Sequence, residues 1–133
     1  MTRSPLLLFE SDDFAVVPGE DEVTNPGVYG KALAGWVGGQ LRGTGVDAGD
    51  VIAEDFGWCE PVKSASCSLY VACSSGDSKG QWRVFVFAEG GLLHRMFGKD
   101  RRAEMVAELY ARVHQCLQLS SRIRNLREEA AGG

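Results

Sequence analysis

The feature that most constrains the fold of this chain is a series of strand-like runs between residues 50 and 88, separated by short spacers. Antiparallel strands can be joined by a tight turn, whereas parallel neighbours need a crossover of roughly a dozen residues or more. The spacing therefore predicts an antiparallel sheet of four to five strands. The clearest run, 81–88, carries Trp82, Val84 and Val86 on one face and Phe85 and Phe87 on the other. Apolar residues on both faces indicate a central strand that is covered, at least in part, on both sides.

Two further segments have apolar residues at helical spacing. Residues 27–42 predict a first helix, preceded by the capping residue Asn25 and containing glycines that would let it pack closely against a sheet. Residues 100–129, with Asp100 at the cap position, contain neither proline nor glycine and predict a long C-terminal helix. Unbroken, that helix would be about 45 Å long. We therefore expect it to break near 119–121 or to project from the domain, where a homodimer through this helix would cover its apolar residues.

The predicted fold class is α+β, with both helices packed on the antiparallel sheet. One domain spanning residues 1–133 is expected, because the chain has the length of an ordinary domain and 44% of its residues are hydrophobic. Residues 1–26 are expected to form a short strand over 5–10 and then an acidic loop, and 50–88 hold the other strands. The predicted core consists of Leu33, Trp36, Val37, Ile52, Trp58, Leu69, Val71, Trp82, Val84, Val86, Leu109 and Val113.

Charge is distributed unevenly along the chain, whose net charge is −4. Residues 1–60 hold eleven acidic and three basic side chains, whereas basic residues outnumber acidic ones from residue 94 onward. An acidic front half disfavours nucleic acid as a partner, because phosphate contacts need a basic surface. The arginines of the C-terminal helix leave nucleic-acid binding as a weaker alternative, since interleaved glutamates can pair with them. An acidic surface suits a basic protein partner, although it also serves simply to keep a protein in solution.

The candidate partner-binding residues are the acidic clusters of the first half together with one nearby tryptophan. Trp58 closes the run Glu54-Asp55-Phe56-Gly57-Trp58, and an exposed aromatic ring with an acidic rim is typical of a binding hot spot. The alternative is a buried aromatic residue beside solvated acids. Because these acids lack the register of a calcium loop or a catalytic pair, neither metal binding nor catalysis is predicted for them. The full set is Asp12, Asp13, Glu20, Asp21, Glu22, Glu54, Asp55 and Trp58.

Four cysteines occur without a C-x-x-C spacing, and no signal-peptide pattern precedes them. This combination predicts reduced thiols and a cytoplasmic location. No run approaches the roughly 20 apolar residues of a membrane span, so no membrane partner is expected. The two histidines, His94 and His114, have no second ligand at metal spacing. We therefore predict no catalytic residue, cofactor or metal, with an enzyme that uses Cys59 or Cys73 as nucleophile kept as a minor alternative.

Two motifs together resemble a group of small, uncharacterised bacterial α+β domains. They are Asn25-Pro26-Gly27-Val28-Tyr29-Gly30 before the first helix and Glu54-Asp55-Phe56-Gly57-Trp58 at a strand junction. Phe56 stands where the pattern usually has tryptophan, which keeps the aromatic ring and removes an N–H donor. The pattern covers roughly residues 20–90 and leaves out the C-terminal helix. The resemblance implies a compact α+β fold and transfers no activity and no catalytic residue.

These observations lead to two main functional hypotheses. The first is a small protein-binding or inhibitory protein, for example an immunity protein that neutralises a toxin by occlusion. The second is an accessory chaperone or adaptor of a secretion system that acts as a dimer. Small size, an acidic front half, the lack of a catalytic arrangement and a long helix with leftover apolar positions favour the first, in which no bond is made or broken.

Overall fold

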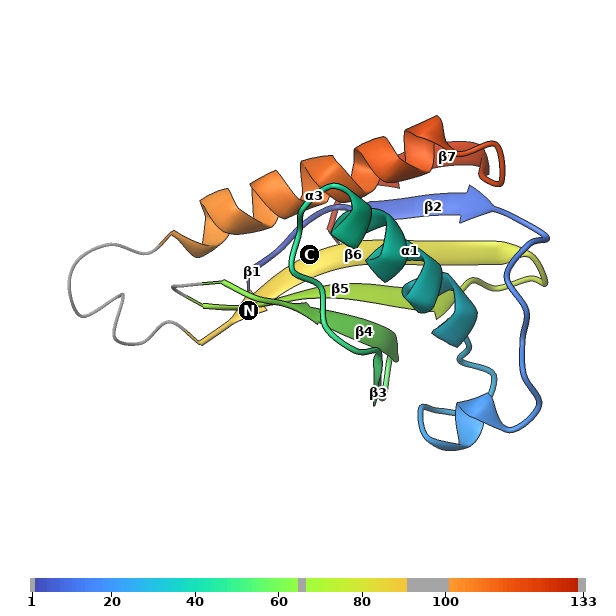
Figure 1. Ribbon diagram of the computed structural model, residues 1–133. Coiled ribbons are helices and arrows are strands. Elements are labelled where there is room, and N and C mark those ends of the chain that lie inside the picture. Colours follow the sequence, from blue (N-terminus) through green and yellow to red (C-terminus); the bar gives the residue numbers. More distant parts are fainter. Residues whose placement is uncertain (1, 65–66, 91–100, 132–133) are drawn as a thin grey trace.

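The computed structural model describes residues 2–64, 67–90 and 101–131, which form an α+β domain. Figure 1 shows the arrangement of its helices and strands. In chain order they are β1 (Thr2–Arg3), β2 (Leu6–Glu10), the short 3₁₀ helix η1 (Glu20–Glu22), α1 (Lys31–Gly43), β3 (Ile52–Glu54), β4 (Gly57–Val62), β5 (Ser68–Ser75), β6 (Gln81–Glu89), α3 (Arg102–Leu119) and β7 (Arg124–Glu129).

The strands form one antiparallel sheet in the order β3-β4-β5-β6-β2-β7, with β1 also paired to β6. The central position predicted for 81–88 is confirmed, because β6 lies between β5 on one side and β2 with β1 on the other. The sheet has seven strands instead of four or five. The short segment β1 and the C-terminal segment β7 account for the difference.

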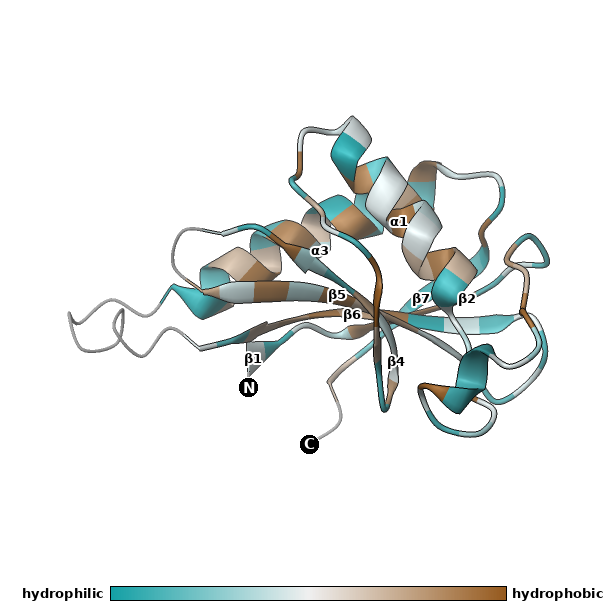
Figure 2. Cartoon of the chain, turned by 60° about the horizontal axis from the view of Figure 1, so that its bottom comes forward, coloured by the Kyte–Doolittle hydropathy of each residue, from teal (hydrophilic) through white to brown (hydrophobic). Residues whose placement is uncertain are grey.

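Both helices lie on the same face of the sheet, as Figure 2 shows. Helix α1 packs over β4 and β5, α3 packs over β6 and β1, and the two helices contact each other. Ten of the twelve predicted core residues are buried between these layers. Trp36 is only partly buried at the edge of the core. Ile52 is 39% exposed, because β3 is a short edge strand beyond the helices.

Helix α1 begins four residues later than the sequence predicts. Its first residue is Lys31, and Gly30 occupies the cap position without a side-chain cap. The carboxylate of Glu20 replaces the expected Asn25 cap by accepting hydrogen bonds from the backbone N–H groups of Gly30 and Lys31, each at 3.1 Å. A negative charge at a helix N-terminus compensates the unpaired N–H groups and the helix dipole.

The predicted helix over 100–129 is wrong beyond residue 119. Helix α3 ends at Leu119, Ser120 has an extended backbone, and the following segment forms β7 against β2. The break is therefore where the sequence predicts it, but a strand follows it. Ile123 and Leu126 pack against the core, so the apolar residues that suggested a dimerising helix are covered within the chain. The expected cap Asp100 lies outside the described residues.

Candidate functional site

The sheet face opposite α1 and α3 carries no helix of the described chain (Figure 2). Side chains alternate between the two faces of a strand. On β2, Leu7 and Phe9 are buried beneath the helices, whereas Leu6 and Leu8 point to the opposite side and are only partly buried. We call that opposite side the open face. It is formed by side chains of β1, β2, β4, β5, β6 and β7.

An aromatic cluster covers the middle of the open face. Tyr70 on β5 stacks on Phe87 of β6 with ring centres 5.0 Å apart and planes 19° apart. Phe56, in the β3–β4 turn, contacts Phe85 and Phe87 at 6.0 Å and 5.8 Å between ring centres. These rings bury the second, smaller apolar cluster of the sheet. Phe56 itself remains 44% exposed, so the cluster offers an aromatic surface to solvent.

A groove of about 630 Å³ runs beside this cluster across β6, β2 and β7. Phe56, Phe85, Leu6 and Leu8 supply its apolar walls, and Arg3, Arg83 and Arg127 bring three guanidinium groups to it. The guanidinium of Arg3 lies over the ring of Phe85, 4.5 Å from its centre. We call this feature the open-face groove.

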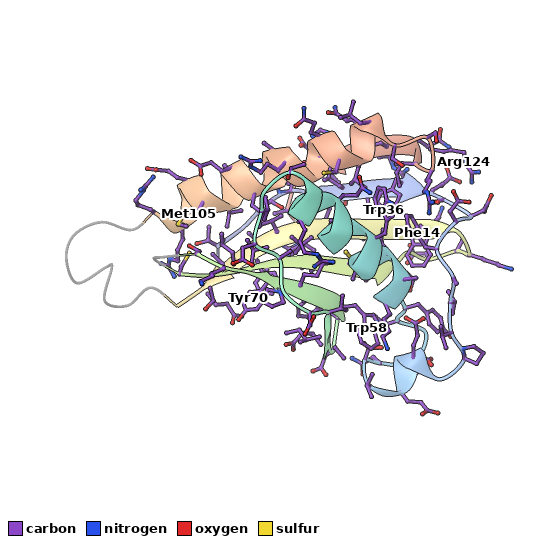
Figure 3. All side chains as sticks on the ribbon, in the orientation of Figure 1. Phe14, Trp36, Trp58, Tyr70, Met105 and Arg124 are labelled. Atoms are coloured by element: carbon purple, nitrogen blue, oxygen red, sulfur yellow. The ribbon has the colours of Figure 1, made fainter. Side chains whose placement is uncertain are left out.

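The predicted partner-binding acids do not form one surface. Asp12 lies beyond β2, where its carboxylate pairs with Arg124 at 3.0 Å, and Asp13 follows it (Figure 3). Glu20 is buried and caps α1, so it is a structural residue that is not accessible to a partner. Asp21 also has an internal role, since it accepts a hydrogen bond from the N–H of Gly27.

Glu22, Glu54 and Asp55 are exposed, as are Asp12 and Asp13. The amide of Asn25 donates a hydrogen bond to the backbone carbonyl of Asp55 at 2.8 Å, which holds the η1 loop beside the β3–β4 turn. Asp55 immediately precedes Phe56 in that turn. An acidic edge therefore borders the open face at its aromatic cluster.

Trp58 is only 6% exposed and does not provide the expected hot spot. Its ring lies on the helix side of β4, where the ammonium of Lys31 approaches to 5.2 Å from the ring centre (Figure 3). Gly57, at φ +152°, turns the chain so that Phe56 faces the open side and Trp58 faces the core. The exposed aromatic residue of this motif is therefore Phe56.

Both cysteines considered as nucleophiles are buried. Burial raises the pKa of the Cys59 thiol to about 12, and the carboxylates of Glu54 and Glu60 add to the shift. Burial likewise raises the pKa of Cys73 well above its usual value. A nucleophilic cysteine needs a thiolate. Neither of these residues offers one near neutral pH.

One carboxyl group is buried on the helix side of the sheet. Glu60 of β4 is 0% exposed, and neither of its carboxyl oxygens has a hydrogen-bond partner. Burial raises its pKa from 4.5 to about 8, although the guanidinium of Arg42 opposes the shift. The side chain fits beneath α1 because residue 38 is glycine. A protonated carboxyl is the form that burial away from water favours.

The residues of the open face were missed as a site because their sequence pattern indicates burial. The alternation of Phe85 and Phe87 with Trp82 and Val84 predicts a strand covered on two sides. Both helices lie on one side of the sheet, so on the other side only the aromatic rings cover the strands. The signal that identifies the site is therefore a mismatch between apolar strand faces and the helices that can cover them.

No group of three or more His, Cys, Asp or Glu side chains suited to a metal ion occurs in the part of the chain that the structure describes. Within the same residues, no helix combines the length and the apolar character of a membrane span. Comparisons of the chain with protein-family models, with curated proteins and with solved structures found no match.

Proposed function

We propose that this chain is a binding protein that acts by occluding a partner protein, and that the open face is its contact surface. The most specific version of this proposal is that the chain is an immunity protein that covers a toxin. The observation that carries the proposal is the aromatic cluster of Phe56, Tyr70, Phe85 and Phe87, which no helix of the described chain covers. Contiguous exposed apolar surface with a polar rim is typical of protein interaction sites, and aromatic residues are enriched there.

The charges around the open face support a protein partner. Glu54 and Asp55 form an acidic edge next to Phe56, which suits a basic patch on the partner and would speed association. The arginines of the groove lie on the same face. A mixed arrangement of charges around an apolar centre favours orientation and specificity over general adhesion.

The proposal involves no chemical step. The buried thiols of Cys59 and Cys73 stay protonated near neutral pH, and binding by shape and charge needs no activated group. The second hypothesis, a dimeric secretion chaperone, depends on the charge and size of the chain and on a long C-terminal helix that could pair with a second copy. Since α3 ends at Leu119, that premise is absent and we favour occlusion by a single chain.

A site-specific photo-cross-linker tests the proposal. Benzoylphenylalanine replaces Leu8 on the open face, and in a matched control it replaces Ala111, which is exposed on α3. Irradiation in the native cell should give one discrete cross-linked product from position 8 and none from position 111. Phe56→Ser should reduce the yield at position 8 by about thirtyfold, because a central aromatic contact contributes roughly 2 kcal/mol.

Three results would contradict the proposal. The first is no product from position 8, and the second is a product from position 111 alone. The third is a product with the mass of two copies of this chain, which would assign the open face to self-association.

A further inference from the structure

We propose that the open-face groove binds a segment of the partner protein in which a carboxylate side chain neighbours an apolar one. Arg3 and Arg127 would receive the carboxylate, and Phe56 and Phe85 would contact the apolar side chain. This inference rests on the proposed function, because it names the chemistry recognised on the same face.

The first argument is the local excess of positive charge. The groove brings together Arg3, Arg83 and Arg127 against the carboxylates of Asp77 and Glu129. Asp77 is engaged by Arg83 at 2.8 Å. Among the described residues, neither Arg3 nor Arg127 takes part in an ion pair. The groove therefore holds one more guanidinium group than carboxylates, in a chain whose net charge is −4, and Arg3 and Arg127 keep their ion-pairing capacity free.

The second argument is that the guanidinium group of Arg3 is preorganised for binding. Its guanidinium is held 4.5 Å from the centre of the Phe85 ring, and its Nε is buried without a hydrogen-bond partner. Stacking fixes the plane of the group before a ligand arrives, which lowers the entropy lost on binding. A guanidinium fork matches a carboxylate in geometry and charge, so this is the ligand group that suits it best.

The third argument separates a polypeptide from a single-stranded nucleic acid. Bases bind such sheets by stacking on free aromatic faces, with several cations along the backbone. Here Tyr70 stacks on Phe87, and Arg3 covers a face of Phe85. The acidic edge at Asp55 would also repel phosphates. Apolar walls with a few cations among them therefore favour an acidic, apolar stretch of protein.

A synthetic peptide tests this inference without the natural partner. The probe is a fluorescein-labelled peptide that repeats Leu-Phe-Glu-Glu, so that each side of the extended chain presents apolar and acidic groups together. Its matched control repeats Leu-Phe-Gln-Gln. Fluorescence polarisation measures binding of each to the full chain, to Arg3→Met/Arg127→Met and to Arg112→Met. Methionine keeps an apolar stem on Phe85, and Arg112 is an exposed arginine of α3.

We expect the acidic peptide to bind the unmodified chain more tightly than the glutamine peptide by about tenfold or more. The double variant should lose this preference, whereas Arg112→Met should keep it. Salt should weaken binding of the acidic peptide more than that of its control.

Equal binding of the two peptides, or no binding of either, would overturn the carboxylate assignment. An oligothymidylate that binds instead, and loses affinity in the double variant, would assign the groove to nucleic acid. Cross-linking at position 8 tests the proposed function independently of the peptide assay. A partner cross-linked there, with its yield unchanged by Arg3→Met/Arg127→Met, would keep the proposed function and reject this inference.

Discussion

At the scale of single residues, the most unusual group is the buried carboxyl of Glu60. It lies beneath α1 with no hydrogen-bond partner for either oxygen, and its pKa is raised to about 8. The folded chain therefore holds a proton that the unfolded chain releases near pH 4.5. Between these two values folding takes up a proton, so the contribution of Glu60 to stability falls as pH rises.

Glu60→Gln should remove this pH dependence, because glutamine is neutral and nearly the same size. Near pH 5 the variant and the parent should have similar free energies of unfolding. Near pH 9 the variant should be more stable by roughly 2–4 kcal/mol, since the parent must then either ionise a buried group or keep its proton at a cost. Urea unfolding across this pH range measures the difference. Parallel pH profiles for the two proteins would show that the carboxyl is not protonated in the fold.

Glu20 is a second residue whose role differs from its sequence pattern. It lies in an acidic run but is buried, and it accepts hydrogen bonds from Val17, Gly30 and Lys31. Glu20→Gln should destabilise the chain by about 1–2 kcal/mol, because the helix N-terminus loses a charge-assisted acceptor. Glu22→Gln is the matched control, since Glu22 is exposed, and it should change stability by less than about 0.5 kcal/mol. Thermal unfolding of both variants tests the assignment, and equal melting temperatures would contradict it.

At the scale of elements, the glycines of α1 differ in whether the fold leaves room for a side chain at their position. A Cβ at position 38 would lie 2.5 Å from a carboxyl oxygen of Glu60, whereas a Cβ at position 39 would meet nothing within 4 Å. The sequence predicts that glycines bring this helix close to the sheet. The structure assigns that role to Gly38 and leaves Gly39 on the solvent side.

Gly38→Ala and Gly39→Ala should therefore have opposite effects on stability. Gly39→Ala should stabilise by up to about 1 kcal/mol through helix propensity. Gly38→Ala should destabilise by about 1–2 kcal/mol, because the buried Glu60 has to move. The Gly38→Ala penalty should disappear when Glu60 is replaced by alanine, a coupling that a double-mutant cycle in chemical denaturation detects. Additive effects of the two substitutions would exclude their contact as the cause.

The strands from residue 57 to 89 follow their sequence pattern well, because alternation of apolar residues is a local signal with a short period. The segment 124–129 does not. Its composition favours a helix, but the unpaired edge of β2, more than a hundred residues earlier in the chain, offers a pairing partner that local reasoning does not contain. The extended backbone of Ser120 ends the helix, and Asn125, at the start of β7, has a positive φ of 54°.

At the scale of the whole molecule, β7 pairs with an edge of the sheet that would otherwise be free. It pairs with β2, and the carboxylate of Glu128 accepts a hydrogen bond from Tyr110 of α3, which ties the strand to the helix layer. The pKa of Tyr110 is raised, mainly through burial and then through this contact. Without β7 the backbone groups of β2 would form a long free edge, and such edges template association.

A chain that ends at Arg122 should therefore be less stable and should associate with itself as its concentration rises. Light scattering across a dilution series measures the association. The full chain with Arg124→Gln is the control, because it loses only the surface pair with Asp12 and should behave like the parent. A truncated chain that stays monomeric and equally stable would show that β7 is dispensable.

The candidate site could be predicted only in part, for a reason that also belongs to this scale. The sequence places Glu54, Asp55 and an aromatic residue at a turn, and the structure keeps the acids exposed there. The sequence does not reveal that Gly57 directs Trp58 toward the core and Phe56 toward the open face. Arg3 and Arg127 come together from opposite ends of the chain, which no local spacing indicates.

The pairing of β2 with β7 has a consequence for synthesis of the protein. During synthesis, β2 is translated more than a hundred residues before β7, its partner strand. Until β7 leaves the exit tunnel, the nascent chain has an unpaired edge at β2 together with the aromatic cluster of the open face. Early contact with a chaperone would shield both during this interval.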